Sequence, residues 1–218
     1  MNVEIEVEML DIKKMELGPL DVNTYIVRKE NSDECFVVDP ADYVPVSEYI
    51  NRNKLKLCAI MLTHGHFDHI LGVAGLKEKY GAKIYIHRSD AQALSDSDMN
   101  MSKLADIIVK PSKADVLLSG GEMLNVAGID IRVISTPGHT RGGVCYIIDD
   151  EKTVFTGDTL FRLSVGRTDL YGASENALIS SLADVMKLDD DYRVLPGHMR
   201  ESSIGFERER NPFIRHFC

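Results

Sequence analysis

The sequence has no run of about 18 apolar residues, so it lacks a segment able to span a membrane as a helix. It also lacks an excess of positive charge. Its 25 lysine and arginine residues against 34 aspartate and glutamate residues give a net charge of −9, which argues against a nucleic-acid partner. Residues 1–8 alternate apolar and acidic side chains and have neither the basic start nor the apolar run of a secretory signal. We therefore expect a cytoplasmic protein.

Motifs for several other chemistries are missing. There is no P-loop and no G-x-G-x-x-G, and residues 162–166 form only part of a G-x-S-x-G elbow because Arg162 stands at its first glycine. The cysteines form no C-x-x-C pair, and three of them lie in apolar runs, so we expect buried reduced thiols rather than disulfides or metal ligands. The four cysteines are Cys35, Cys58, Cys145 and Cys218.

What the sequence does contain is a cluster of metal-binding side chains at residues 63–69, Thr-His-Gly-His-Phe-Asp-His. The apolar run 57–62 before it predicts a buried strand. Side chains two apart point the same way on an extended segment but lie about 200° apart around a helix, so His64 and His66 can bind one ion only if the segment is extended. Asp68 and His69 follow, before a helix expected to begin near Ile70. We expect them at an adjacent metal site.

Three further donors, His139, Asp158 and His198, each follow an apolar strand and stand at or beside a glycine. Asp39 also ends a strand, where it either supports the site or forms a turn before Pro40. His87 has no partner in its local sequence, and we expect it not to be a ligand.

Apolar alternation and turn residues predict an α+β chain. The expected strands are 3–10, 23–28, 35–38, 57–62, 83–86, 122–126, 129–135, 143–148, 153–156 and 194–195. The expected helices are 43–53, 70–80, 89–94 and 174–187, with a short one in the tail 202–218. Residues 95–110 form a surface segment, either a lid or a passive loop, and a long loop runs from 157 to 172. We predict one domain over 1–218, a four-layer αββα sandwich of two mixed sheets with helices outside and all strand-end loops at one edge.

These motifs resemble those of the metallo-β-lactamase superfamily, and most closely those of the glyoxalase II group, the hydroxyacylglutathione hydrolases, and their shorter bacterial relatives. The matching runs are THGHFDH at 63–69, PGHT at 137–140, GDTLF at 157–161, GRTDL at 166–170, LPGH at 195–198 and NPF at 211–213. The resemblance implies the metallo-β-lactamase fold and a pair of divalent ions, zinc first, with iron or manganese as alternatives. It assigns His64, His66 and His139 to the first ion, Asp68, His69 and His198 to the second, and Asp158 as the bridge. Asp68 and Asp158 would also be the catalytic carboxylates.

The activity that the resemblance implies is hydrolysis of a small-molecule thioester, such as an S-hydroxyacylglutathione, by a metal-bridging hydroxide. A thiol, with a pKa of about 8.5, leaves without a strong general acid. Arg167 either binds an anionic group of the substrate or pairs with Asp169. Alternatives are hydrolysis of another ester or lactone, and a persulfide dioxygenase with one iron. The sequence departs from the family after His198: Met199-Arg200-Glu201 follows, and with twenty residues after His198 we expect a chain without the helical domain of glyoxalase II. Because that domain supplies much of the glutathione pocket in the family, the resemblance does not fix the substrate. The sequence does not indicate an oligomeric state.

Overall fold

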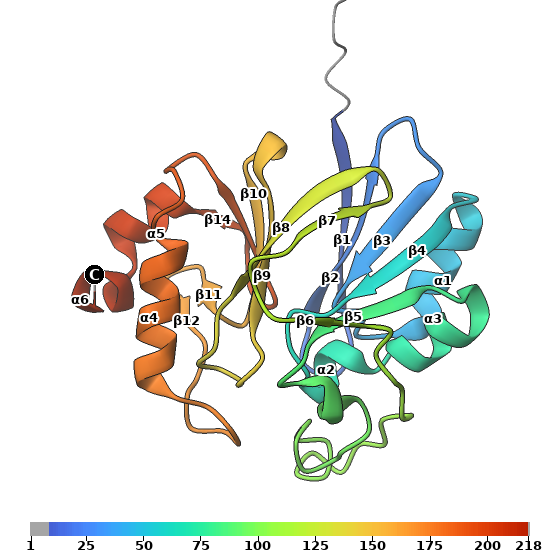
Figure 1. The fold of residues 1–218 in the computed structure, drawn as a ribbon, viewed down its shortest axis with the longest axis horizontal. Helices are drawn as coiled ribbons and strands as arrows, with labels where there is room; N and C mark the ends of the chain where they lie inside the picture. The colour runs from blue at the N-terminus through green and yellow to red at the C-terminus, as the bar shows by residue number, and fades with distance from the viewer. Residues whose placement is uncertain (1–8, 218) are drawn as a thin grey trace, which may run out of the picture.

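Two six-stranded mixed β-sheets pack face to face, with helices on their outer faces (Figure 1). The computed structural model describes residues 9–217. The first sheet has the order β1 (Leu10–Leu17), β2 (Val22–Lys29), β3 (Glu34–Val38), β4 (Lys56–Met61), β5 (Lys83–His87) and β6 (Val116–Leu118). The second has the order β14 (Ser202–Ser203), β13 (Arg193–Pro196), β10 (Thr153–Gly157), β9 (Val144–Ile148), β8 (Ile129–Ser135) and β7 (Met123–Val126). The predicted α+β sandwich of two mixed sheets is confirmed.

Successive side chains of a strand point to opposite faces of its sheet. The central strands are buried on both faces, because the other sheet covers one face and the helices cover the other. In β3, Phe36 and Val38 pack between the sheets, whereas Cys35 and Val37 pack against the helices. The two sheets meet through large rings. Tyr25 of β2 contacts Phe155 of β10 edge to face, with the ring centroids 5.2 Å apart.

Helices cover the outer face of each sheet and bury one apolar stripe against it. The first sheet is covered by α1 (Tyr43–Arg52) and α3 (Val73–Tyr80), and the second by α4 (Glu175–Val185), α5 (Ile204–Arg210) and α6 (Pro212–Phe217). Helix α1 begins where the Asp42 side chain accepts a hydrogen bond from the Val44 amide at 2.9 Å. Helix α3 ends at Gly81, whose φ of 67° suits glycine. Two 3-10 turns are also present, Ala91–Leu94 and Asp149–Glu151, and the first stands where a helix was predicted over 89–94. Within residues 9–217, no helix has the length and apolar character needed to cross a membrane.

The helix predicted to begin near Ile70 starts three residues earlier and is interrupted. A short helix α2 (Phe67–Ile70) precedes α3, and the chain turns between them at Gly72. The Gly72 amide donates to the Pro40 carbonyl at 2.8 Å, and a Cβ at this glycine would lie 2.7 Å from the same oxygen. Close packing against the loop after β3 therefore divides the helix.

The predicted strand 3–10 lies mostly outside the described residues, and the described strand β1 runs from Leu10 to Leu17. Two other expectations need correction. The long loop expected at 157–172 contains a hairpin of β11 (Leu160–Phe161) and β12 (Ser164–Val165). The tail forms β14 and two helices instead of one. Strands of two residues are too short to show a period of two in the sequence.

Replacing Ile50 with alanine should lower the free energy of unfolding by about 2–5 kcal/mol, because its fully buried side chain packs α1 onto the first sheet. Urea unfolding followed by circular dichroism measures the loss. Val44→Ala on the same helix is the control. Its side chain is 55% exposed, so its effect should stay within about 0.5 kcal/mol. Equal losses in the two variants would contradict this packing of α1.

Candidate metal centre

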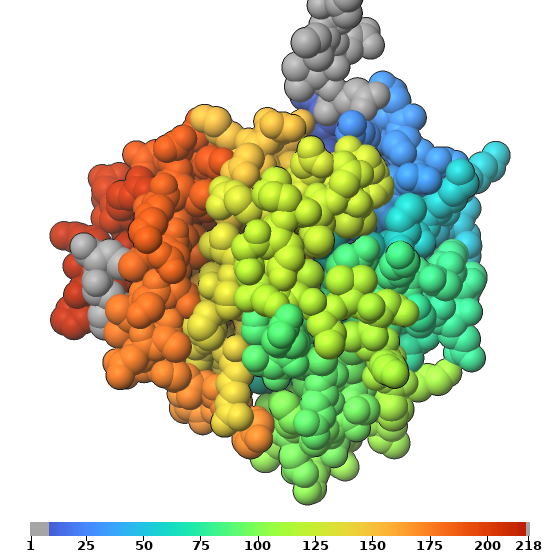
Figure 2. Space-filling view, in the orientation of Figure 1, coloured from blue at the N-terminus to red at the C-terminus, as the bar shows by residue number. Residues whose placement is uncertain are grey.

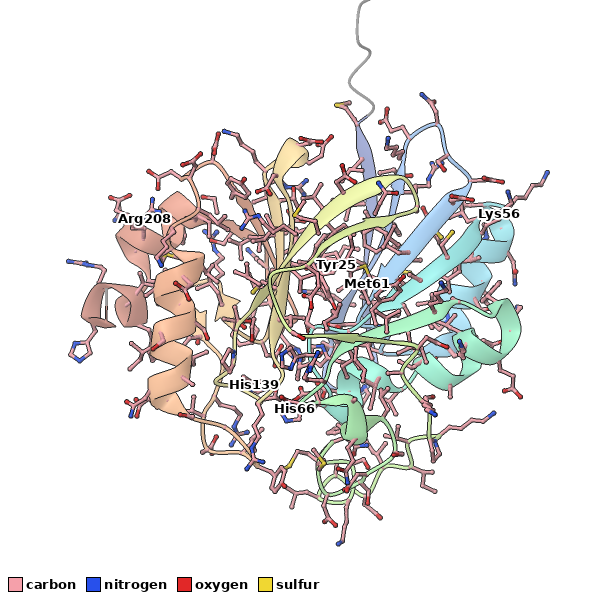
Figure 3. All side chains as sticks on the ribbon, in the orientation of Figure 1. Tyr25, Lys56, Met61, His66, His139 and Arg208 are labelled. Carbon is pink, nitrogen blue, oxygen red and sulfur yellow. The ribbon has the colours of Figure 1, made fainter. Side chains whose placement is uncertain are left out.

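All the predicted donors lie at the edge where the two sheets meet. They follow the ends of four strands: β4 leads into residues 63–69, β8 into 136–140, β10 into Asp158, and β13 into 197–198. Figure 3 shows His66, from the first of these loops, beside His139, from the second. The structure therefore gathers side chains that span more than a hundred residues of sequence. The seven donors are His64, His66, Asp68, His69, His139, Asp158 and His198.

Three imidazoles form the first cluster. His64, His66 and His139 each place one ring nitrogen within 4.8 Å of the others. Their ring centroids are 4.9, 5.0 and 4.6 Å apart, so the rings surround one point almost evenly. The Nδ1 of His139 lies 2.9 Å from the Arg167 carbonyl oxygen, which orients Nε2 towards the cluster when Nδ1 carries the proton. This is the arrangement of a three-histidine metal site.

The second cluster consists of Asp68, His69 and His198, whose ligand atoms also lie within 4.8 Å of one another. Asp158 lies between the clusters. Its Oδ2 is 3.4 Å from His139 Nε2, and its Oδ1 is 3.4 Å from His69 Nε2. One carboxylate thus faces both clusters.

The electrostatics of the donors suit a cation. Burial and the neighbouring imidazoles lower the pKa of His64, and burial and His139 lower that of His66 to about 3, so both rings are neutral at neutral pH and can offer lone pairs. Burial alone would raise the pKa of Asp68, but the surrounding imidazoles lower it, and the carboxylate is ionised. Burial alone would lower the pKa of His69, but the nearby carboxylates raise it to about 10, because they stabilise positive charge at this point. A divalent ion bound there would take the place of the proton on His69.

Buried atoms of the site without a hydrogen-bond partner among the described residues include Nε2 of His64 and Oδ1 of Asp158. His66 faces the cluster with Nδ1, which lies 2.9 Å from His139 Nε2. A buried polar atom without a partner costs free energy, and a coordinated ion would remove that cost for atoms aimed at it. The donor set of imidazoles and carboxylates fits divalent ions. We conclude that the residues present fit a divalent-metal centre.

Asp39 supports the centre from the end of β3. Its carboxylate accepts hydrogen bonds from the Thr63 amide at 2.8 Å and the Thr63 hydroxyl at 2.6 Å. It also lies 2.9 Å from His69 Nδ1, so Nε2 of that ring points to the second cluster. Of the two roles that the sequence left open for Asp39, the structure shows the supporting one.

Asp90 has a comparable role that the sequence analysis missed. Its buried carboxylate accepts a hydrogen bond from the Gly65 amide at 3.0 Å and packs against Gly142, where an added Cβ would lie 2.6 Å from the Asp90 Oδ1 atom. It therefore ties the loop that carries His64 and His66 to the turn that carries His139. A signal existed: Asp90 follows β5, another strand of the first sheet, close to the same edge.

The turn before His198 is held by β2. The Asn23 side-chain amide donates to the carbonyl oxygens of Pro196 and Met199, each at 2.9 Å. The ring of Tyr25 packs in the core, and its hydroxyl donates to the Pro196 carbonyl at 2.8 Å. Strand β2 thus fixes the position of the turn that carries His198, which lies more than 170 residues later in the sequence.

The C-terminal helices hold the β11–β12 hairpin beside the centre. The buried Glu207 carboxylate accepts a hydrogen bond from the Leu163 amide at 2.8 Å, and the Asn211 side chain donates to the Ser164 carbonyl at 3.0 Å. Asn211 also donates to Glu207 at 2.8 Å. The NPF run at 211–213 therefore contributes to the shape of the site from outside it.

The donors open onto a cavity of about 490 Å³. Arg167 lines this cavity, and its guanidinium donates to both carboxylate oxygens of Asp169 at 2.7 Å each. The ion pair is thus present, and substrate binding by Arg167 stays a prediction. Residues Met101 and Leu104 of the 95–110 segment form part of the cavity wall.

Residues expected to lie outside the centre do so. His87 belongs to none of the metal-ligand clusters found within residues 9–217, and its Nδ1 accepts a hydrogen bond from the Ser89 amide at 3.2 Å. Cys35 and Cys145 are buried free thiols, and Cys58 is a half-buried one.

Comparisons with known proteins agree with this geometry. The sequence model of the Metallo-beta-lactamase superfamily matches residues 17–198. A Bacillus subtilis (strain 168) protein named "Probable metallo-hydrolase YqgX" is 34% identical over 208 residues, covering 94% of this chain and 98% of its own. A hydroxyacylglutathione hydrolase of Francisella tularensis subsp. novicida is 34% identical over 169 residues, covering 77% of this chain and 60% of its own.

Solved structures resemble the chain over nearly its whole length. BLEG-1 B3 metallo-beta-lactamase superposes with a TM-score of 0.89 at 32% identity, covering 94% of this chain and 99% of that one. TTHA1623, in a di-iron-bound form, superposes with a TM-score of 0.84 at 33% identity, covering 92% and 99%.

Asp90→Asn should weaken metal binding by about 10–100-fold, because the uncharged amide is a weaker acceptor for the Gly65 amide and disturbs the tight contact with Gly142 that joins the two metal-binding loops. Competition with a chromogenic chelator measures the affinity. Asp98→Asn is the control, since this exposed carboxylate only pairs with Lys103. Unchanged affinity in Asp90→Asn would show that the loops keep their geometry without this carboxylate.

Proposed function

This chain belongs to the metallo-beta-lactamase superfamily, and we propose that it is a metal-dependent hydrolase that cleaves a thioester such as an S-hydroxyacylglutathione. The position of Asp158 carries the proposal. Its carboxylate lies between a three-histidine cluster and a second cluster of Asp68, His69 and His198, with one oxygen within 3.4 Å of a ring nitrogen on either side. A centre built for two ions favours hydrolysis.

We assign His64, His66 and His139 to one ion, Asp68, His69 and His198 to the other, and Asp158 to both. Zinc is our first choice, because imidazole and carboxylate donors suit it. Iron is the alternative, since the similar protein TTHA1623 is described in a di-iron-bound form. When bound, two such ions would lower the pKa of water and polarise a carbonyl group.

The side chains of the protein orient this chemistry. Asp39 and the Arg167 carbonyl hold the rings of His69 and His139, so each keeps one nitrogen towards the centre. The carboxylates of Asp68 and Asp158 line the cavity and can accept the proton that water releases on attack. Hydrolysis forms a bond between the water oxygen and the acyl carbon and breaks the carbon–sulfur bond. The thiolate leaves directly, since its conjugate thiol has a pKa of about 8.5.

The similar hydroxyacylglutathione hydrolase of Francisella tularensis subsp. novicida is why we name an S-acylglutathione as the substrate. Arg167, at the cavity wall, is our candidate for contact with a carboxylate of the glutathione part. Its pairing with Asp169 leaves it exposed at the surface, where an anion can share the guanidinium.

Asp158→Asn should reduce thioester hydrolysis by at least about 100-fold and lower the metal content below two ions per chain, because an amide binds cations less well than a carboxylate. S-lactoylglutathione cleavage and elemental analysis of the purified protein measure the two effects. Asp130→Asn, at an exposed carboxylate of β8, is the control. Full activity and two ions in Asp158→Asn would refute the bridging role.

The dioxygenase alternative predicts different results in the same preparations. It requires a single iron per chain and oxygen consumption with glutathione persulfide, and it gives no hydrolysis of S-lactoylglutathione. The second cluster favours the hydrolase, because one iron bound by two histidines and one aspartate would leave it without a role.

A further inference from the structure

We propose that the cavity beside the metal centre binds the acyl chain of the substrate and selects an apolar chain over a short hydroxylated one. This rests on the proposed thioester hydrolysis and, among S-acylglutathiones, places apolar acyl groups ahead of the hydroxyacyl groups named above. The volume of about 490 Å³ lies within the range of about 300–1,000 Å³ usual for small-molecule pockets.

The cavity walls are apolar on three sides, and each side comes from a different part of the chain. Met101 and Leu104 belong to the 95–110 segment, Phe161 and Val165 to the β11–β12 hairpin, and Leu20 and Met199 to the two turns joined by Asn23. In Figure 2 the 95–110 segment forms the lower end of the molecule, beside the orange residues near 170, and Met99 and Tyr171 line one small cavity there.

Few polar groups face the cavity apart from the metal donors. Apart from those donors, two of the described residues that line the cavity are polar, Ser164 and Arg167, and the Arg167 side chain is 63% exposed to solvent rather than buried inside. Burying the carboxylates and the ammonium group of glutathione in such a space would cost free energy without returning hydrogen bonds. The charged thiol part therefore belongs at the mouth near Arg167, and the acyl chain belongs inside.

Large apolar side chains of these walls remain exposed to solvent. Leu104 is 79% exposed, Met199 55% and Leu20 52%. An apolar chain bound between them would remove both its own surface and theirs from water, which is the main driving force for apolar ligands. A lactoyl group is too short and too polar to make use of these walls.

The walls are anchored, so the cavity is formed before substrate binds. The buried Asn100 carbonyl accepts a hydrogen bond from the Phe67 amide at 2.9 Å, which fixes the 95–110 segment to the metal-binding loop. The Met199 carbonyl is held by Asn23, and the hairpin by Glu207 and Asn211. Met199 is also where the sequence departs from the glyoxalase II pattern, directly after the last metal donor.

A series of S-acylglutathiones with acetyl, lactoyl, butyryl, hexanoyl and octanoyl groups tests this, because the leaving group stays constant. Each methylene that becomes buried should raise kcat/KM by about fourfold. We expect hexanoyl to exceed acetyl by at least about tenfold, and butyryl to exceed lactoyl. Thioesters of the uncharged thiol N-acetylcysteamine should show the same dependence on acyl length.

Leu104→Ser and Met199→Ser should each reduce the ratio of hexanoyl to acetyl by about threefold or more, since each removes one apolar wall. Both positions are exposed, so neither change should unfold the protein. Ile108→Ser is the matched control. This side chain lies on the same segment, is 94% exposed and does not line the cavity, so the ratio should be unchanged.

Hydrolysis that stays level or falls with chain length, or that prefers lactoyl to butyryl, would overturn the acyl-pocket proposal while leaving thioester hydrolysis intact. Failure to cleave any thioester would overturn the proposed function.

Calorimetric binding of acetate and octanoate to the metal-loaded protein tests the cavity without turnover, because each acid has one carboxylate and the two differ only in the length of the alkyl chain. Octanoate should bind at least about tenfold more tightly, and less so in Leu104→Ser. Equal affinities would refute the apolar pocket.

Discussion

The concentration of imidazoles and carboxylates at one buried edge is the constraint on which the rest of this structure depends. Five histidines and two aspartates converge where the two sheets meet, and all but Asp158 and His198 are at least nine-tenths buried. Ionisable groups at such a position are unfavourable unless they are paired, hydrogen-bonded or bound to a cation. The fold must therefore hold each ring and carboxylate in a fixed relation to the others.

It does so with hydrogen bonds made by residues that are not themselves predicted metal ligands. Asp39 orients His69, Asp90 joins the two loops of the three-histidine cluster, and Asn23 holds the turn before His198. Each of these side chains comes from the first sheet, whereas His139 and His198 come from the second. The sandwich thus does more than bury apolar surface: side chains of the first sheet and its loops fix His69 of the same sheet as well as the turn before His198 of the other.

The site combines a polar floor with apolar walls, and the two parts have different structural origins. The floor consists of strand-end loops, which rigid strands position within the core. The walls come from the β1–β2 turn, the 95–110 segment and the β11–β12 hairpin, which lie outside the two large sheets. Relatives with the same metal-binding loops can thus differ in the segments that line the cavity. Membership of the superfamily therefore specifies metal-dependent chemistry more closely than it specifies the substrate.

The sequence by itself determined the donors and the main layers. Four donors after an apolar strand, and three more at later strand ends, pointed to the centre before any contact was known, and strand β8 was predicted to the residue. It did not reveal the β11–β12 hairpin, the early start of the helix at Phe67, or the roles of Asp90, Glu207 and Met199. The spacing of apolar residues indicates which side of a helix or strand is buried, and this pattern can be seen within a short stretch of the chain. Only the tertiary structure decided which carboxylate meets which amide and which leucine lines the cavity, since those partners are tens of residues apart and meet only when the two sheets pack.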